Sequence, residues 1–386
     1  MNIGIATLAG RNAALSGLYN TVAGAIKGGA ANLLPGSHND FATDGPNGLV
    51  QTGYIWDSAL RAGLTVRNYG FFIDLSKYNL PKADGGLFPN DYAAAPYNYL
   101  RSPYTLGLTV AISTNPTLAP YTDPYFRGFD NAFPDVWRVE EWQREFGQYV
   151  TNGNLPNLTL LRLMHDHTGN FGGSDPAVAG LSTPELQQAD NDLAVGRVVD
   201  TVAHSPYAGS TLIFVLEDDA QDGPDHMDAH RSTAYIVGPY VKQNAVVSTR
   251  YTTVNLVRTI EDILGLDHLN LNDAYQRPMT DVFDLNQTSW TYSAMASPYL
   301  AATTIATADP SIRFADSLPA KPARSAAWWA TATRGFDWSA ADRVPADLLN
   351  EVQWEGLMPG VPYPHQRSGL DLRRRVMTDA SGAKKD

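Results

Sequence analysis

The 386-residue chain contains no cysteine, and this absence removes several classes of chemistry. Disulfide bonds, thiolate nucleophiles and cysteine-ligated zinc sites are excluded, while the compartment in which the protein works is left open. Basic residues are also scarce, because 28 Lys and Arg stand against 40 Asp and Glu and give a formal net charge of -12. Nucleic-acid binding depends on basic patches, so this balance argues against a nucleic-acid partner.

Long uninterrupted apolar runs are missing as well. The longest mildly apolar stretch near the start, residues 19–34, is broken by Lys27 and several glycines, which makes it unsuitable as a membrane span. It also lacks the apolar centre of a signal peptide. The sequence therefore predicts no membrane span and shows no export signal. Aromatic residues are plentiful instead, and 19 Tyr and 8 Trp indicate long aromatic-rich loops.

Helix and strand patterns alternate between residues 53 and 265. Helical periodicity covers 53–62, 134–150, 183–205 and 252–264, and apolar runs typical of buried strands cover 64–70, 157–164, 211–217 and 233–237. Thr183 suits the N-cap of the third helix, and Pro184 suits its first turn. The alternation predicts an α/β fold, with a mainly parallel sheet and helices on both faces.

The segments outside this alternation set the expected domain boundaries. Residues 1–52 are rich in Gly, Ala and Asn, and a short helix at 16–26 is the one regular element expected there. The α/β domain is predicted to span 53–285, with a loop-rich insertion near 77–130 whose aromatic content favours ordered loops. Residues 286–386 are expected to form an irregular C-terminal arm, rich in Pro and Trp, with a frayed end.

Acids and histidines gather where two of the predicted strands end. The strands 157–164 and 211–217 each run into such a cluster: Asp166 and His167 after the first, and Asp218, Asp219, His226 and His230 after the second. The carboxyl ends of parallel strands meet at one edge, where open α/β sheets bind ligands. Crowded carboxylates and imidazoles are donors that divalent metal ions accept. A metal site at this edge is therefore the first hypothesis.

Each cluster also has a simpler interpretation. Junctions between strands and loops are commonly polar, and His226 and His230 could be solvated loop residues. The polar residues 190–192 are expected to favour the dipole of the helix that carries them, with a contact to the site as the alternative. His204 and His268 are interpreted as structural. Two such clusters at equivalent strand ends favour a shared metal site over two unrelated polar junctions.

Several segments together resemble a known family. The run from Phe214 to Arg231, the triplet Asp166-His167-Thr168 and residues 189–197 (ADNDLAVGR) carry the resemblance, with support from 53–57, 155–158 and 248–264. They resemble bacterial phosphoesterases of the alkaline phosphatase superfamily, in the branch that includes acid phosphatases and phosphatidylcholine-type phospholipases C. The resemblance covers about residues 53–282 and implies an alkaline-phosphatase-like fold.

The resemblance also implies a reaction and a set of site residues. Metal ligands would be Asp166, Asp218, Asp219 and His226, with Zn, Ca, Mg or Mn as the divalent ion, and the catalytic residues would be His167 and His230. The substrate would be a phosphate ester, either a small molecule or a phospholipid head group. In this family the metal activates a Ser or Thr hydroxyl for phosphoryl transfer, and hydrolysis follows. Members are often exported, which implies a periplasmic or secreted location.

The chain departs from this family in its first 52 residues. The family's acid–Asn metal motif and its nucleophile precede the segment that matches 53–57, and residues 1–52 offer only weak hydroxyl candidates such as Ser37 and Thr43. We therefore expect an incomplete site with weak metal affinity and little or no activity alone. The alternatives are a sulfatase-like or phosphonate-hydrolysing relative, and a non-catalytic binding or surface protein on the same scaffold.

Overall fold

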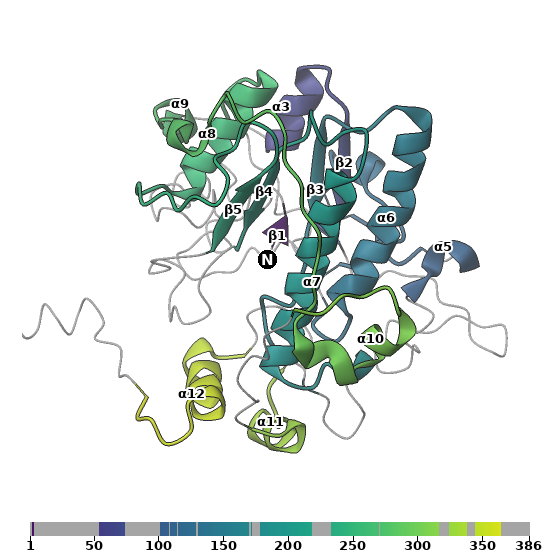
Figure 1. Ribbon diagram of the computed structural model, residues 1–386, viewed down its shortest axis with the longest axis vertical. Helices are drawn as coiled ribbons and strands as arrows, with labels where there is room; N and C mark the ends of the chain where they lie inside the picture. Colours follow the sequence, from purple (N-terminus) through teal and green to yellow (C-terminus); the bar gives the residue numbers. More distant parts are fainter. Residues whose placement is uncertain are drawn as a thin grey trace, which may run out of the picture.

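A computed structural model describes residues 2–3, 54–73, 101–169 except 108, 114 and 129, then 171, 178–217, 233–315 except 270, 324–337 and 344–363. It is a mixed fold of helices around a small sheet (Figure 1). The strands are β1 (Asn2–Ile3), β2 (Val66–Tyr69), β3 (Leu158–Leu161), β4 (Ile213–Leu216) and β5 (Ala234–Val237). The helices of the main body are α3 (Ile55–Arg61), α5 (Pro103–Leu106), α6 (Asp135–Asn152), α7 (Pro184–Ala203), α8 (Thr253–Leu264) and α9 (Leu271–Ala274).

Further helices follow towards the C-terminus. They are α10 (Thr304–Ala308), α11 (Ala326–Ala332) and α12 (Ala346–Leu357). Short 3-10 turns lie at η4 (Ala119–Tyr121), η5 (Val178–Gly180), η6 (Thr280–Val282) and η7 (Pro298–Ala302). Within the part of the chain that the structure describes, no helix is both long enough and apolar enough to cross a membrane. The helix expected at 16–26 and residues 77–100 of the loop-rich insertion lie outside the described residues.

The sheet has the order β2-β3-β1-β4-β5. Strands β2 and β3 are parallel, with Val66 opposite Leu158. The two-residue β1 lies antiparallel to both β3 and β4, so β4 runs in the same direction as β2 and β3. The prediction of a mainly parallel sheet is thus correct for these three strands. The sequence predicted no strand near residue 2, and β1 corrects that expectation.

Strand β5 also differs from the expectation. It pairs antiparallel with β4, and Ala234 and Tyr235 are exposed. The prediction of a buried strand at 233–237 is therefore wrong. An apolar run of β-branched and aromatic residues suits an edge strand as well as a central one, because β-propensity depends on the neighbours rather than on the backbone alone.

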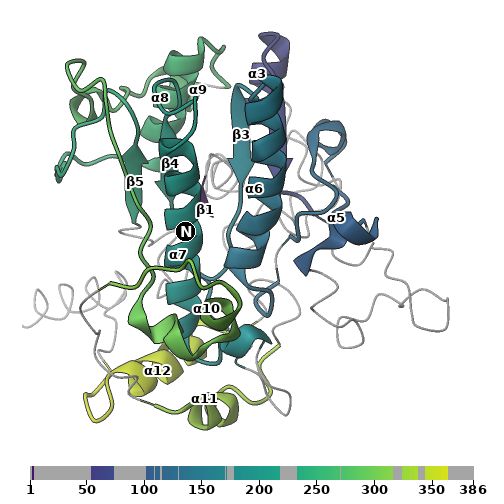
Figure 2. The same cartoon turned by 45° about the vertical axis from the view of Figure 1, so that its right-hand side comes forward.

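Side chains of the sheet alternate between two apolar cores. In β4, Phe214 and Leu216 belong to one core, while Ile213 and Val215 belong to the other. The first core includes residues of α3 and α8, and the second includes residues of α6 and α7. Helices therefore cover both faces, as the alternation predicted. Helices α6 and α7 run side by side over their face in both views (Figures 1 and 2).

Local signals explain where the long helices begin and end. The hydroxyl of Thr183 accepts a hydrogen bond from the Leu186 N–H at 3.4 Å, and Pro184 opens α7. Helix α6 ends at Gly153 and α8 ends at Gly265, both with φ 67°. Glycine adopts this left-handed conformation without the steric cost that a Cβ brings.

The first part of the C-terminal region packs against the main body. Residues Trp290, Tyr299, Ile312 and Phe314 lie against the core of α6 and α7. Helices α11 and α12 lie further away, below the lower edge of the sheet in Figure 1. The sequence predicted an irregular arm here, and short helices connected by loops replace that expectation.

Candidate functional site

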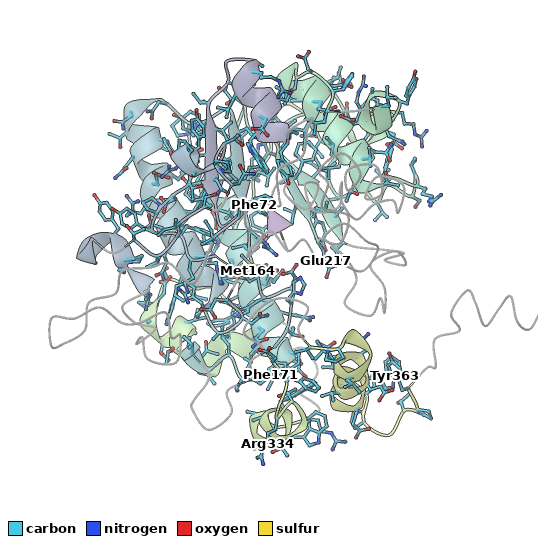
Figure 3. All side chains as sticks on the ribbon, turned by 180° about the vertical axis from the view of Figure 1, so that it is seen from behind. Phe72, Met164, Phe171, Glu217, Arg334 and Tyr363 are labelled. Carbon is cyan, nitrogen blue, oxygen red and sulfur yellow. The ribbon has the colours of Figure 1, made fainter. Side chains whose placement is uncertain are left out.

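The carboxyl ends of β2, β3 and β4 lie along one edge of the sheet. Figure 3 labels a residue after each strand, namely Phe72, Met164 and Glu217, and all three lie across the middle of the molecule. Phe171 lies lower in the same view, between this edge and the C-terminal helices. Ligand sites of open α/β sheets form at such an edge, and the sequence predicts the site residues there.

Asp166 and His167 follow β3 at this edge. Asp166 is buried and His167 is partly buried. The backbone of His167 turns back on itself, since its N–H donates to the carbonyl oxygen of Met164 at 3.0 Å. The side-chain amide of Asn131 donates to the carbonyl oxygen of His167. The segment after β3 is therefore a fixed turn rather than an open loop.

Glu217 is the first residue after β4, and it is partly buried. One of its carboxylate oxygens accepts a hydrogen bond from the Thr233 N–H at 3.2 Å. Burial raises the pKa of Glu217, and the nearby negative charge of Asp166 raises it further. The two acids from β3 and β4 thus come within electrostatic reach of each other, although β1 lies between their strands.

The other predicted site residues, Asp218, Asp219, His226 and His230, lie outside the described residues. In the sequence, Asp218 directly follows Glu217. The structure therefore brings Asp166 and His167 to the end of the sheet from which the second cluster departs. The sequence predicts that these two strand ends converge, but it does not indicate that Glu217 is the residue of the second strand end that lies near Asp166.

Asp135, His165 and Asp190 form a second, fully buried group close to this edge. Their side chains are completely buried, and their ligand atoms lie within 4.8 Å of one another. His165 Nδ1 lies 2.7 Å from Asp190 Oδ2, and His165 Nε2 lies 2.9 Å from the carbonyl oxygen of Asn131. Both ring nitrogens face acceptors, so the imidazole is satisfied when both donate and it is positively charged.

Charges within this group compensate each other. Burial alone would lower the pKa of His165, but the hydrogen bond that its ring donates to Asp190 and the charges of Asp135 and Asp190 raise it. Burial alone would raise the pKa of Asp135, but the positive charges of Arg138 and His165 lower it. Two buried carboxylates therefore face two buried cations, which is the condition under which buried charges are tolerated.

The group also fixes the start of α6 and the end of β3. Asp190 accepts hydrogen bonds from the Asp135 N–H at 2.6 Å and the Val136 N–H at 3.2 Å, so a residue of α7 caps α6. Asp135 accepts from the Met164 N–H at 2.9 Å and the His165 N–H at 2.8 Å. The expectation that residues 190–192 serve the dipole of their own helix is wrong for Asp190, because it serves the neighbouring helix instead.

A further group, formed by Glu261, His268 and Asp273, also has ligand atoms within 4.8 Å of one another. His268 Nδ1 lies 2.9 Å from Glu261 Oε2, and His268 Nε2 lies 2.9 Å from the Arg258 guanidinium. Burial and the adjacent Asp273 raise the pKa of Glu261 to about 9. Both groups have acids and a histidine that could hold a metal ion. In each, however, the imidazole already has protein partners on both nitrogens.

No family model matches the sequence, and a search of curated proteins finds no match.

The structure adds functional candidates that sequence reasoning missed. Asp135 lies in the first turn of α6 and His165 directly precedes Asp166, and the sequence alone shows no partner for either residue. Their partner Asp190 is 25 residues from His165. The nearest sequence signal was the acid at the first position of a helix, which is common for electrostatic reasons alone.

Proposed function

We propose that the chain is a metal-dependent phosphoric ester hydrolase domain whose centre lies at the carboxyl edge of β3 and β4. The observation that carries this proposal is that β3 and β4 run in the same direction and deliver Asp166 and Glu217 to one edge of the sheet. The charge of Asp166 raises the pKa of Glu217, which agrees with their proximity. Asp218 and Asp219 follow directly. Several acids delivered to one partly buried place repel each other, and a cation offsets that repulsion.

The donor types predicted for this centre suit a divalent metal ion. We assign Asp166, Asp218, Asp219 and His226 as its ligands, since carboxylate oxygens and imidazole nitrogens suit Zn, Mn and, for the oxygens, Ca and Mg. Such an ion, when bound, acts as a Lewis acid on a phosphoryl oxygen. His167 and His230 would donate hydrogen bonds to the phosphoryl oxygens. The alkaline-phosphatase-like arrangement of the sheet is part of the same proposal.

The fixed turn after β3 supports the role of His167. Its backbone is held from both sides, by Met164 and by Asn131. A group that must meet a phosphoryl oxygen works best when it is held close to its working geometry in advance. The buried group of Asp135, His165 and Asp190 stabilises the start of the same turn, because the carboxylate of Asp135 accepts hydrogen bonds from the N–H groups of Met164 and His165.

Hydrolysis assays test the proposal. The chain would be stripped with EDTA and then assayed with p-nitrophenyl phosphate, bis-p-nitrophenyl phosphate, p-nitrophenyl phosphorylcholine and p-nitrophenyl sulfate in the presence of Zn, Mn, Ca or Mg. Because residues 1–52 offer only weak candidates for the nucleophile, we expect at most slow hydrolysis of a phosphate ester. This activity should need the ion and should disappear when Asp218→Ala and Asp219→Ala are combined. Asp262→Ala on α8, an exposed acid far along the chain, is the matched control.

The outcomes separate the alternatives. Preference for the sulfate ester favours the sulfatase-like relative. Metal binding without hydrolysis of any ester favours the non-catalytic binding protein on this scaffold. If the chain neither binds a divalent ion nor hydrolyses an ester, the proposed function is wrong.

A further inference from the structure

Side-chain amides hold three consecutive residues of the turn after β3. Each amide comes from a different part of the chain, and each contacts one residue of the turn. The pairs are Asn131 with His167, Gln353 with Thr168, and Gln187 with Gly169. The amide of Gln187 both accepts from the Gly169 N–H at 2.7 Å and donates to the Gly169 carbonyl oxygen at 2.5 Å.

Gln353 differs from the other two because it comes from the C-terminal arm. It lies on α12 and is 185 residues from Thr168 in the sequence. Its side-chain N–H donates to the Thr168 hydroxyl oxygen. Thr168 is only 2% exposed, so water has little access to replace this donor. A buried hydroxyl that loses its partner costs free energy, which makes the contact specific.

A second contact joins the arm to Phe171, which follows two residues after Gly169. The ring of Phe171 lies 5.3 Å from the ring of Trp329, which belongs to α11 and is fully buried. Helix α12 approaches Trp329 at Gly356, where a Cβ would lie 2.1 Å from the indole ring. Glycine is therefore required at this crossing. Helices α11 and α12 pack together there, and the pair contacts Thr168 through Gln353 and Phe171 through Trp329.

We infer that the arm formed by α11 and α12 is part of the candidate site and that Gln353 is a positioning residue for His167. Thr168 follows His167 directly, so a hydrogen bond that fixes Thr168 restricts the backbone torsions that aim the imidazole. Asn131 fixes the carbonyl group between the two residues. The inference rests on the proposed function in one respect, which is that His167 contacts the phosphoryl group of a substrate. The mechanical coupling between α12 and the turn stands on the contacts alone.

Two isosteric variants remove the coupling without opening a cavity. Gln353→Met keeps the length of the side chain and loses the amide, and Thr168→Val keeps the shape and loses the hydroxyl. Gln353→Glu is the rescue variant, because its carboxylate can accept a hydrogen bond from the Thr168 hydroxyl. Glu355→Gln is the matched control, since it lies on α12 and weakens only an exposed ion pair with Arg324.

Two measurements report on the turn whether or not the protein is an enzyme. Hydrogen exchange would follow the backbone amides of residues 165–169, and NMR would follow the pH titration of the His167 ring, assigned with His167→Gln. We expect Gln353→Met to speed exchange about 2- to 10-fold, which is the effect of one net hydrogen bond. The His167 titration should move in the same variant, which a merely structural role in the arm would not cause.

Further comparisons decide the outcome. The double variant of Gln353→Met and Thr168→Val should behave like either single variant, because both remove the same interaction. Gln353→Glu should restore slow exchange, and Glu355→Gln should leave both measurements unchanged. Unchanged exchange and an unchanged His167 titration in Gln353→Met would overturn the inference. A Mn²⁺ titration of the unaltered chain separates the two proposals. If Mn²⁺ does not bind, the proposed function is wrong, and the hydrogen-exchange result still decides whether Gln353 positions the turn.

Discussion

Replacement of Asp190 by asparagine tests how the turn that carries Asp166 and His167 is supported. The carboxylate of Asp190 accepts three hydrogen bonds, from the Asp135 N–H, the Val136 N–H and the His165 ring. Asparagine has one acceptor oxygen, so its amide nitrogen must face at least one of these donors. The variant also removes the negative charge beside a buried imidazolium. Both effects destabilise the folded state.

The magnitude follows from complete burial. Because Asp190 and His165 are each fully buried, removing one partner leaves the other charge without compensation. Such a loss typically costs about 3–5 kcal/mol. We therefore expect Asp190→Asn to lower the free energy of unfolding in urea by about that amount. Glu140→Gln on α6 is the control, because the Arg101–Glu140 ion pair is partly exposed and should contribute less than about 1 kcal/mol.

The pH dependence gives an independent check on the same residue pair. Because the folded state raises the pKa of His165 above its ordinary value of 6.5, the stabilisation is fully present below about pH 6.5 and is lost as the pH rises through the folded pKa. Asp190→Asn should flatten this part of the stability profile measured by circular dichroism in urea. A loss below about 1 kcal/mol, with an unchanged profile, would refute the reasoning.

Two further predictions concern other parts of the molecule. The pKa of Glu261 is raised from 4.5 to about 9, so the folded state keeps a proton on its carboxyl group and the free energy of unfolding should fall as the pH rises between these values. Glu261→Gln should flatten this pH dependence in urea unfolding. Equal pH dependence in the variant and the unaltered chain would contradict the assignment. Gly356→Ala should force Trp329 or α12 to move, at a cost of about 1–3 kcal/mol and with a changed near-ultraviolet circular dichroism signal. Gly147→Ala on α6, where a Cβ meets nothing within 4 Å, should be neutral or slightly stabilising, and equal behaviour of the two variants would count against the packing described.

Much of the central fold was predictable because its signals are local. The cap at Thr183, the glycines after α6 and α8, and the apolar periodicity of these helices lie within a few residues of the features they determine. The alternation of helix and strand then implied a sheet with helices on both faces. The edge position of β5 was not predictable in the same way, because it depends on which strand lies beside it and not on its own residues.

The candidate site was predictable only in part. Asp166 was singled out because it follows an apolar strand, and Glu217 now connects it to the acids after β4. The partnership of Asp135, His165 and Asp190 could not be read from the sequence, since it joins two helices and a strand end. Gln353 lies farther still, and a glutamine in a helix carries no signal of its own. Contacts of this kind become visible only once the chain is folded.

The most direct test of the metal site is a crystal structure of the chain soaked with Mn²⁺ and measured for anomalous scattering. Our account predicts an anomalous peak at the carboxyl edge of β3 and β4, with a carboxylate oxygen of Asp166 about 2.0–2.6 Å away. The peak should vanish when Asp218→Ala and Asp219→Ala are combined. A peak only at Glu261, His268 and Asp273, or no peak at all, would contradict the account.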